Sequence, residues 1–202
     1  MKVEEVLEIA RLGEILKQTS RSGWALAGVI SYRPESVAEH MYGTLFLASV
    51  FGEALLSAGE RLDMAKVLTM AAIHDLPESI TSDIPRTATE IGGARMLEAK
   101  KAVESEAMKK LLGHSREHLK ALENSWKELQ EGESIEARMV RSCDILDMIL
   151  HATALEESGV DARKLEGFFL NSKPELEQLG IRLIQEVFEV LFAAHRTRIE
   201  SS

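Results

Sequence analysis

The segment AAIHDLPESITSDIP, residues 71–85, places the end of an apolar stretch directly against a histidine and three carboxylates. The apolar residues stop before His74 and Asp75, and Glu78 and Asp83 follow within the next turns of the chain. Charged groups at the edge of a core cost free energy unless opposite charges or hydrogen bonds pair with them. A bound metal ion would provide such a partner, so this segment predicts a metal site at the end of a buried helix.

Length and composition fit one domain with a sizeable core. The chain has 202 residues, of which 45% are hydrophobic. It contains no apolar run of about 18 residues, so we expect no transmembrane helix. Residues 1–18 have the pattern of an amphipathic helix and lack the basic start and short apolar block of a signal peptide. Cys143 is the single cysteine, which excludes an internal disulfide and predicts a cytoplasmic location.

The charge balance bears on the class of partner. With 33 acidic and 24 basic residues, the formal net charge is −9. An acidic balance disfavours broad electrostatic binding to a nucleic acid polymer, which needs a basic surface, and we also expect no membrane partner. A small phosphorylated substrate remains compatible, because one metal ion and one or two arginines attract phosphate locally.

Helical periodicity dominates the sequence. Residues 19–36 contain three glycine or proline breaks and are expected to form a loop. The predicted helices cover about residues 3–18, 37–58, 63–76, 94–112, 115–130, 134–157, 161–171 and 174–199. We therefore predict an all-α helical bundle that forms a single domain over residues 1–202. Its motif-bearing core covers about residues 10–155, and additional C-terminal helices cover about residues 160–200.

Local end signals support several of these boundaries. Ser36 and Glu39 form the S-x-x-E pattern of a capping box at the start of a helix. Asp63 is expected to cap the next helix, which should end before Pro77. Pro174 is expected to separate two C-terminal helices.

Two further residues extend the polar cluster at residues 74 and 75. His40 lies one turn into its predicted helix, and Asp144 interrupts the apolar helix MVRSCDILDMIL. Two imidazoles and two carboxylates from three helices suit a divalent transition metal such as Co, Mn, Fe, Ni or Zn. Taken singly, each residue also has an ordinary explanation, because His40 can be a hydrogen-bonded helix residue and Asp144 can pair with Arg141.

The order and setting of these residues resemble a known family. They follow the H…HD…D order of the HD-domain metal-dependent phosphohydrolases. The segments RPESVAEHMYG, residues 33–43, and AAIHDLPESITSDIP resemble its 5′-deoxynucleotidase branch, and the similarity covers about residues 10–155. The resemblance implies an all-α fold, a homodimer and one divalent metal ion. By that resemblance, the metal ligands are His40, His74, Asp75 and Asp144, with Asp147 one turn later as the alternative to Asp144.

The resemblance also implies catalytic roles for Glu78 and Asp83. Hydrolysis of a phosphate monoester requires an oriented water and a proton donor for the leaving 5′-oxygen, and a carboxylate beside the metal can serve either need. The alternative for Glu78 is a carboxylate that stabilises only the start of a short helix.

Arg21 and Trp24 are the candidate substrate-binding residues. The family uses an arginine and a tryptophan in this loop to hold phosphate and sugar. Some members have the two residues adjacent, whereas Ser22 and Gly23 separate them here. The alternatives are a solvated arginine and a tryptophan that covers the core.

The remaining histidines receive no role in the site. His114 and His118 have a spacing that can bind metal, but their polar neighbours predict a solvated helix face, and His195 is expected at the surface. The resulting hypothesis is a phosphomonoesterase that acts on deoxynucleoside 5′-monophosphates. The rivals are a cyclic-nucleotide phosphodiesterase or nucleotide pyrophosphohydrolase on the same scaffold, and a non-catalytic nucleotide- or metal-binding module.

Overall fold

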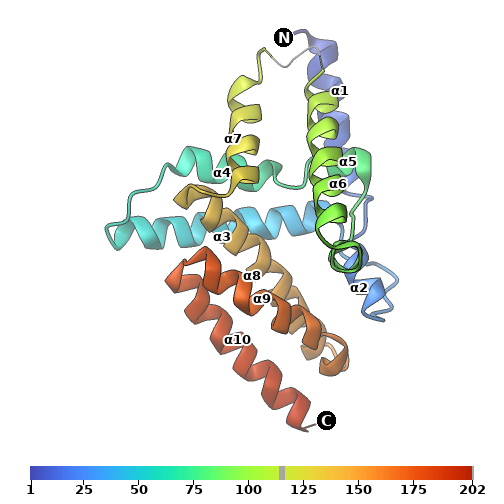
Figure 1. Ribbon diagram of the computed structural model, residues 1–202, viewed down its shortest axis with the longest axis vertical. Coiled ribbons are helices and arrows are strands. Elements are labelled where there is room, and N and C mark those ends of the chain that lie inside the picture. Colours follow the sequence, from blue (N-terminus) through green and yellow to red (C-terminus); the bar gives the residue numbers. More distant parts are fainter. Residues whose placement is uncertain (114–116, 202) are drawn as a thin grey trace. The chain divides into compact units, whose positions relative to one another are not determined.

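A computed structural model describes residues 1–113 and 117–201 (Figure 1). Contacts within the chain divide it into two compact units, which are described separately below. The first comprises Met1–Met41 and Ile73–Lys127, and the second comprises Tyr42–Ala72 and Glu128–Ser202. Within the described residues, regular structure is helical apart from one isolated β-bridge between Ser20 and Ser36. The prediction of an all-α fold is confirmed.

The first unit is built from the N-terminal helices and from the segment that follows His74. In its main apolar core, the buried Ile73 packs with Trp126 and with the end of the helix that stops at Leu112. A smaller apolar cluster contains Leu16 and Val37. The helices that contribute to this unit are α1 (Val3–Leu16), α2 (Ser22–Leu26), the start of α3 (Val37–Ser57), α5 (Glu78–Thr81), α6 (Arg86–Leu112) and most of α7 (Lys120–Glu131).

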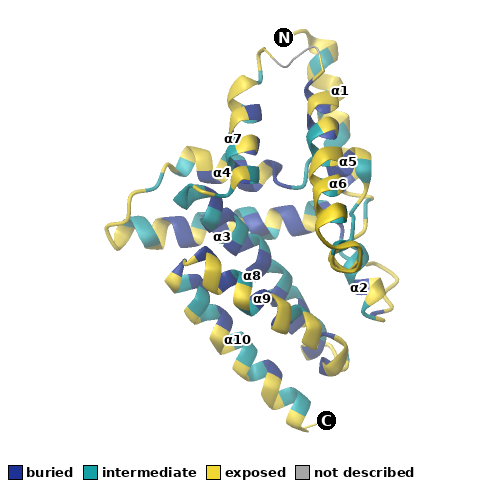
Figure 2. Ribbon diagram, in the orientation of Figure 1, coloured by how far each residue is buried: buried dark blue, intermediate teal, exposed yellow. Residues whose placement is uncertain are grey.

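The second unit packs its C-terminal helices on one long helix. The remaining part of α3 belongs to this unit, together with α4 (Met64–Ile73) up to Ala72, α8 (Ile135–Glu157), the short 3₁₀ helix η2 (Ala162–Lys164), α9 (Glu166–Leu179) and α10 (Arg182–Ser201). Helices α9 and α10 pack on α8 and on each other. Figure 2 shows buried and exposed residues alternating along α10, as expected for an amphipathic helix that covers a core.

His195 is buried in this second unit, so the prediction of a surface position was wrong. Its side chain has no exposed area, and its ring stacks on Phe169 with the centroids 4.0 Å apart. The Nδ1 atom lies 2.5 Å from Glu156 Oε1, and Arg198 donates a hydrogen bond of 3.0 Å to the other oxygen of Glu156. A buried carboxylate with two cationic or hydrogen-bonding partners is the compensation that burial of charge requires.

The predicted capping residues act as expected. Ser36 Oγ accepts a hydrogen bond of 3.2 Å from Glu39 N, and Glu39 accepts one of 2.8 Å from Ser36 N. Asp63 Oδ1 accepts a hydrogen bond of 3.2 Å from Lys66 N at the start of α4. The capping box of Ser36 and Glu39 fixes the start of α3, the helix that carries His40.

Several predicted boundaries were wrong. Helix α4 ends at Ile73 instead of before Pro77, and the predicted loop contains the short helix α2. Helix α6 begins at Arg86 and contains a break at Gly93, where φ is 59°. Pro174 lies inside α9, and the chain breaks instead at Gly180, which has φ of 72°.

The position of Pro174 has a physical explanation in the packing around it. A proline inside a helix removes one backbone hydrogen bond and costs about 3 kcal/mol. Phe169 and Leu176, on either side of Pro174, are almost completely buried, so α9 has apolar contacts that offset this cost.

Two remaining predictions concern the histidines at positions 114 and 118 and the absence of a transmembrane helix. His118 is exposed, as predicted, but it lies in the turn before α7 instead of on a helix, and His114 lies outside the described residues. Across residues 1–113 and 117–201, no helix is both long enough and apolar enough to cross a membrane.

Candidate active site

Three of the four predicted metal ligands meet within the first unit. His74 Nε2 lies 3.3 Å from His40 Nε2 and 3.3 Å from Asp75 Oδ2. His40 Nε2 lies 3.7 Å from the same Asp75 oxygen. His40 is fully buried and His74 is 8% exposed. The structure thus brings two imidazole nitrogens and one carboxylate oxygen to a single point.

Local structure places each of these donors. His40 lies in the first turn of α3, directly after the capping box. His74 and Asp75 lie in the turn that leaves α4, where Leu76 N donates to Ile73 O and Glu78 N donates to Asp75 O. This turn redirects the chain into α5, so that Asp75 and Glu78 are held by the same backbone hydrogen bond.

The spacing of the three donors fits a shared divalent ion. Ligands about 2.1 Å from a metal lie about 3.0 Å apart at adjacent octahedral positions and about 3.4 Å apart in a tetrahedron. The observed separations of 3.3–3.7 Å are close to these values. Two histidines and a carboxylate are also the donor types that transition metals prefer.

Arg21 reaches this group of donors from the N-terminal loop. Its Nη1 lies 3.3 Å from Asp75 Oδ2, and both side chains are only 17–20% exposed. Burial by itself raises the pKa of Asp75, but His74, Arg21 and His40 outweigh this effect and hold the pKa well below its ordinary value. Asp75 is therefore ionised, as a metal ligand must be, and Arg21 is placed where an anion beside the metal donors would meet it.

Glu78 is a buried carboxyl group beside other carboxylates. It is 4% exposed, and its Oε2 atom has no hydrogen-bond partner. Burial raises the pKa of Glu78 to about 10, with contributions from the charges of Asp75 and Asp83. Glu78 is thus protonated at neutral pH and has a proton to donate.

Asp83 is held by the loop that carries Arg21. Its Oδ2 atom accepts hydrogen bonds of 2.5 Å from Ser22 N and 2.7 Å from Ser22 Oγ. These two bonds join the segment after α5 to the start of α2.

Trp24 is buried, and its indole is engaged by a carboxylate. It is 4% exposed, and its Nε1 donates a hydrogen bond of 2.7 Å to Glu35 Oε2. Glu35 is half-buried and lies five residues before His40. Sequence analysis gave Glu35 no role, although its place in the quoted RPESVAEHMYG segment was the available signal.

Helix α6 contributes two charged residues that sequence analysis also missed. Lys100 Nζ donates a hydrogen bond of 3.4 Å to Ile84 O and lies 3.6 Å from Glu104 Oε1. Burial raises the pKa of Glu104 although Lys100 opposes the shift, and the charge of Asp75 adds to it. The i, i+4 spacing of Lys100 and Glu104 was visible in the sequence, but such pairs are common on solvated helices.

Asp144 lies on α8 in the second unit and is half-buried. Its place in the ligand set stays a prediction. Asp147, the alternative, packs against Gly43 of α3, where a Cβ atom would lie 1.9 Å from Asp147 Oδ1. A glycine is therefore needed at position 43 for this approach of the two helices.

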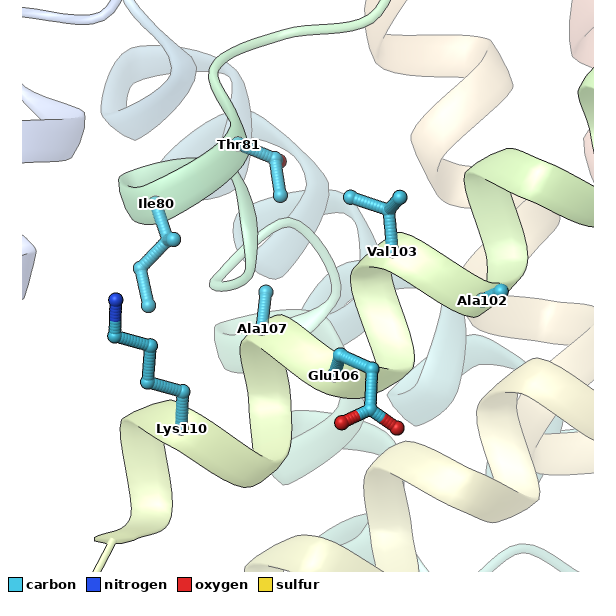
Figure 3. Close-up of a pocket in the computed structure, with 7 residues that line it drawn as sticks. All are labelled: Ile80, Thr81, Ala102, Val103, Glu106, Ala107 and Lys110. Carbon is cyan, nitrogen blue, oxygen red and sulfur yellow. The ribbon is translucent and has the colours of Figure 1, made fainter.

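A separate pocket of about 370 Å³ lies between α5 and α6 (Figure 3). Its side walls are largely apolar, and none of its lining residues is a predicted ligand or catalytic residue. The lining residues are Ile80, Thr81, Ala102, Val103, Glu106, Ala107 and Lys110.

Comparison with known proteins gives a consistent set of relatives. The sequence model described as HD domain matches residues 13–179. The human 5′-deoxynucleotidase HDDC2 is 33% identical over 90% of this chain and 85% of its own length, and the bovine protein of that name has the same identity and coverage. Among solved structures, the PH0347 protein of Pyrococcus horikoshii superimposes with a TM-score of 0.75 at 34% identity, covering 96% of this chain and 99% of that one. A conserved hypothetical protein of Pyrococcus furiosus gives a TM-score of 0.76 at 31% identity, covering 93% and 99%.

Proposed function

Because the chain belongs to the HD domain family, we propose that it is a metal-dependent phosphomonoesterase that hydrolyses deoxynucleoside 5′-monophosphates to deoxynucleoside and phosphate. The observation that carries this proposal is the meeting of His40, His74 and Asp75 beside the buried carboxyl group of Glu78. The names of the curated relatives supply the substrate class.

The proposed metal ligands are His40, His74, Asp75 and Asp144, which together would hold one divalent ion. The donor types suit Co, Mn, Fe, Ni or Zn. When bound, the ion would polarise the phosphoryl group and lower the pKa of a bound water. Asp147 is the alternative fourth ligand.

In the proposed reaction, the bond between phosphorus and the 5′-oxygen breaks as a water oxygen bonds to phosphorus. Glu78 donates its proton to the leaving 5′-oxygen, which leaves as the hydroxyl group of the deoxynucleoside. Asp83 accepts a hydrogen bond from the attacking water and orients it. One proton of this water stays on the released phosphate, the other passes through Asp83 to solvent, and Glu78 regains a proton from solvent.

Arg21 is the proposed phosphate-binding residue. We expect Arg21→Ala to raise KM for every nucleotide substrate by about 10- to 100-fold, because a charge-assisted hydrogen bond contributes about 1.5–3 kcal/mol. The ratio of activity on ribo- and deoxyribonucleotides should stay constant, since the phosphate is common to both. Steady-state kinetics on one matched pair of nucleotides, compared with the exposed Arg95→Ala as a control, would measure this. An unchanged KM would remove Arg21 from the phosphate site.

Trp24 is the proposed sugar-selecting residue, and it acts from a buried position beside Glu35. If the indole excludes a 2′-hydroxyl, an unsatisfied hydroxyl group costs about 1–3 kcal/mol, which gives about 5- to 150-fold discrimination against ribonucleotides. We expect Trp24→Ala to raise the relative activity on ribonucleotides and to weaken binding of both classes. Trp24→Phe keeps an aromatic ring but removes the hydrogen bond to Glu35 and part of the buried indole. An unchanged ribo/deoxyribo ratio in Trp24→Ala would leave Trp24 as a core residue.

A substrate panel separates this function from its rivals. The proposal expects phosphate release from deoxynucleoside 5′-monophosphates once a divalent metal is added. Turnover of a cyclic nucleotide or of a nucleoside triphosphate in its place would indicate another hydrolase of this scaffold. Metal and nucleotide binding without turnover would indicate a binding module, in which the buried, unpaired Glu78 would have no evident use.

We further propose that the protein acts in the cytoplasm as a homodimer and binds neither nucleic acid polymers nor membranes. The single Cys143 and the net charge of −9 support the location and the absence of polymer binding. Tyr42, Phe46 and Val50 expose an apolar stripe on α3, which is compatible with a protein contact. Light scattering during gel filtration would give the oligomeric state.

A further inference from the structure

The loop that carries Arg21 is attached on one side to the segment before α3. Arg21 N donates a hydrogen bond of 2.9 Å to Glu35 O, and Val37 N donates one of 2.8 Å to Thr19 O. Ser20 and Ser36 form a β-bridge between the same two segments. Since backbone groups make these bonds, almost any side chain at these positions would keep them.

The other side of the loop is attached through a side chain. Ser22 directs both its backbone N–H and its hydroxyl group to Asp83 Oδ2, at 2.5 and 2.7 Å. Bonds to an ionised acceptor are shorter and stronger than bonds between neutral groups. The hydroxyl bond depends entirely on the residue type at position 22.

Asp83 is itself held in a fixed loop. The preceding Ser82 has φ of 61°, which is uncommon for a residue other than glycine, and Lys100 donates a hydrogen bond to Ile84 O. Ser22 is therefore bound to a carboxylate in a fixed position. Because Ser22 is held there, the residue before it in the chain is held as well.

That neighbour is Arg21, whose guanidinium reaches Asp75 at 3.3 Å. We propose that Ser22 is a positioning residue that, with Asp83, holds the Arg21 backbone so that its guanidinium faces a phosphate beside the metal donors. The proposal rests on the proposed function, because it assigns the use of Arg21 to phosphate binding. No chemistry occurs at Ser22. We expect its hydroxyl to act through Arg21, because the backbone N–H of Ser22 still holds Asp83 when the hydroxyl is removed.

A double-mutant cycle distinguishes positioning from a general structural effect. We expect Ser22→Ala to raise KM about 10-fold, equivalent to ~1.4 kcal/mol, with kcat within about twofold of the wild type. In an Arg21→Ala background, the same change should alter KM by less than about twofold, because the residue through which Ser22 acts is absent. Ser22→Thr, which retains a hydroxyl group, should restore KM to near the wild-type value. Ser20→Ala, an exposed serine in the same loop, is the matched control and should behave as the wild type.

The opposite results would overturn the proposal. An equal rise in KM in both backgrounds, or a fall in kcat with unchanged KM, would mean that Ser22 does not act through Arg21. Binding of inorganic phosphate to the metal-loaded protein, measured by calorimetry across the same four variants of the cycle, gives a second readout. If the wild type released no phosphate from deoxynucleotides but the cycle held for inorganic phosphate, the proposed function would fail while the role of Ser22 stood. Additive effects on phosphate affinity would overturn the role of Ser22 instead.

Discussion

The His74→Ala variant is expected to bind no stoichiometric divalent metal and to have no measurable phosphatase activity. His74 Nε2 is the atom within 3.3 Å of both other donors, so its loss leaves His40 and Asp75 without their common neighbour. Removal of a residue that hydrogen-bonds to a metal ligand lowers metal affinity or activity about 10- to 100-fold, and removal of a direct ligand lowers them more. Metal content by elemental analysis and phosphate release after metal addition would measure both effects.

The folded structure of this variant should persist, because the apolar core of the first unit is built around Ile73 and Trp126 rather than around the donors. The matched control is His118→Ala, which removes an exposed histidine from the same unit. Asp75→Ala and Asp144→Ala should lose metal in the same way, and Asp147→Ala should retain it. Full metal content and full turnover in His74→Ala would show that the site assignment is wrong.

Replacement of Glu78 with glutamine is expected to lower kcat by about 10²–10⁴ while the metal stays bound, because a general acid is lost and no proposed ligand is. Glutamine has nearly the same size and shape as protonated glutamate, so substrate should still bind. Elemental analysis beside steady-state kinetics would separate this variant from the ligand variants. Full activity in Glu78→Gln would mean that Glu78 only stabilises the start of a short helix.

The same substitution should stabilise the metal-free protein. The pKa of Glu78 is about 10 in the folded state, above the 4.5 of an unperturbed glutamate, so folding requires proton uptake between these values. The contribution of Glu78 to stability is therefore fully present below about pH 4.5 and is lost as the pH rises toward 10. Glutamine cannot ionise and removes this loss.

The gain in unfolding free energy from Glu78→Gln should consequently increase from pH 6 to pH 8, with a ceiling of about 1.4 kcal/mol per pH unit. Chemical denaturation of the metal-free protein at both values would measure it. Glu98→Gln replaces an exposed glutamate on α6 and should show no such pH dependence. A stability difference that does not change with pH would mean that Glu78 is already ionised in the folded protein.

Features that depend on neighbouring residues in the chain could be predicted from the sequence. The capping pair Ser36 and Glu39 is an example, since both partners lie within one helical turn. The meeting of His40 with His74 joins distant segments, and it was predicted because the resemblance supplied what spacing alone could not.

Features set by long-range packing could not be read in this way. The residues that follow His195 are mainly polar, and two residues that bury it, Phe169 and Glu156, come from other helices. Ser22 and Asp83 are 61 positions apart, and no local pattern joins them. Pro174 was a sound break signal locally, but the packing of α9 outweighed it.

The most direct test of the account is metal-dependent phosphate release from a matched pair of nucleotides. Purified protein would be stripped of metal, titrated with one divalent ion at a time, and assayed on dAMP and AMP. The account predicts no release without metal, activity that saturates near one ion per chain, and faster turnover of dAMP than of AMP. Phosphate release that is as fast without added metal as with it would contradict the account. So would the absence of release from both nucleotides with every metal.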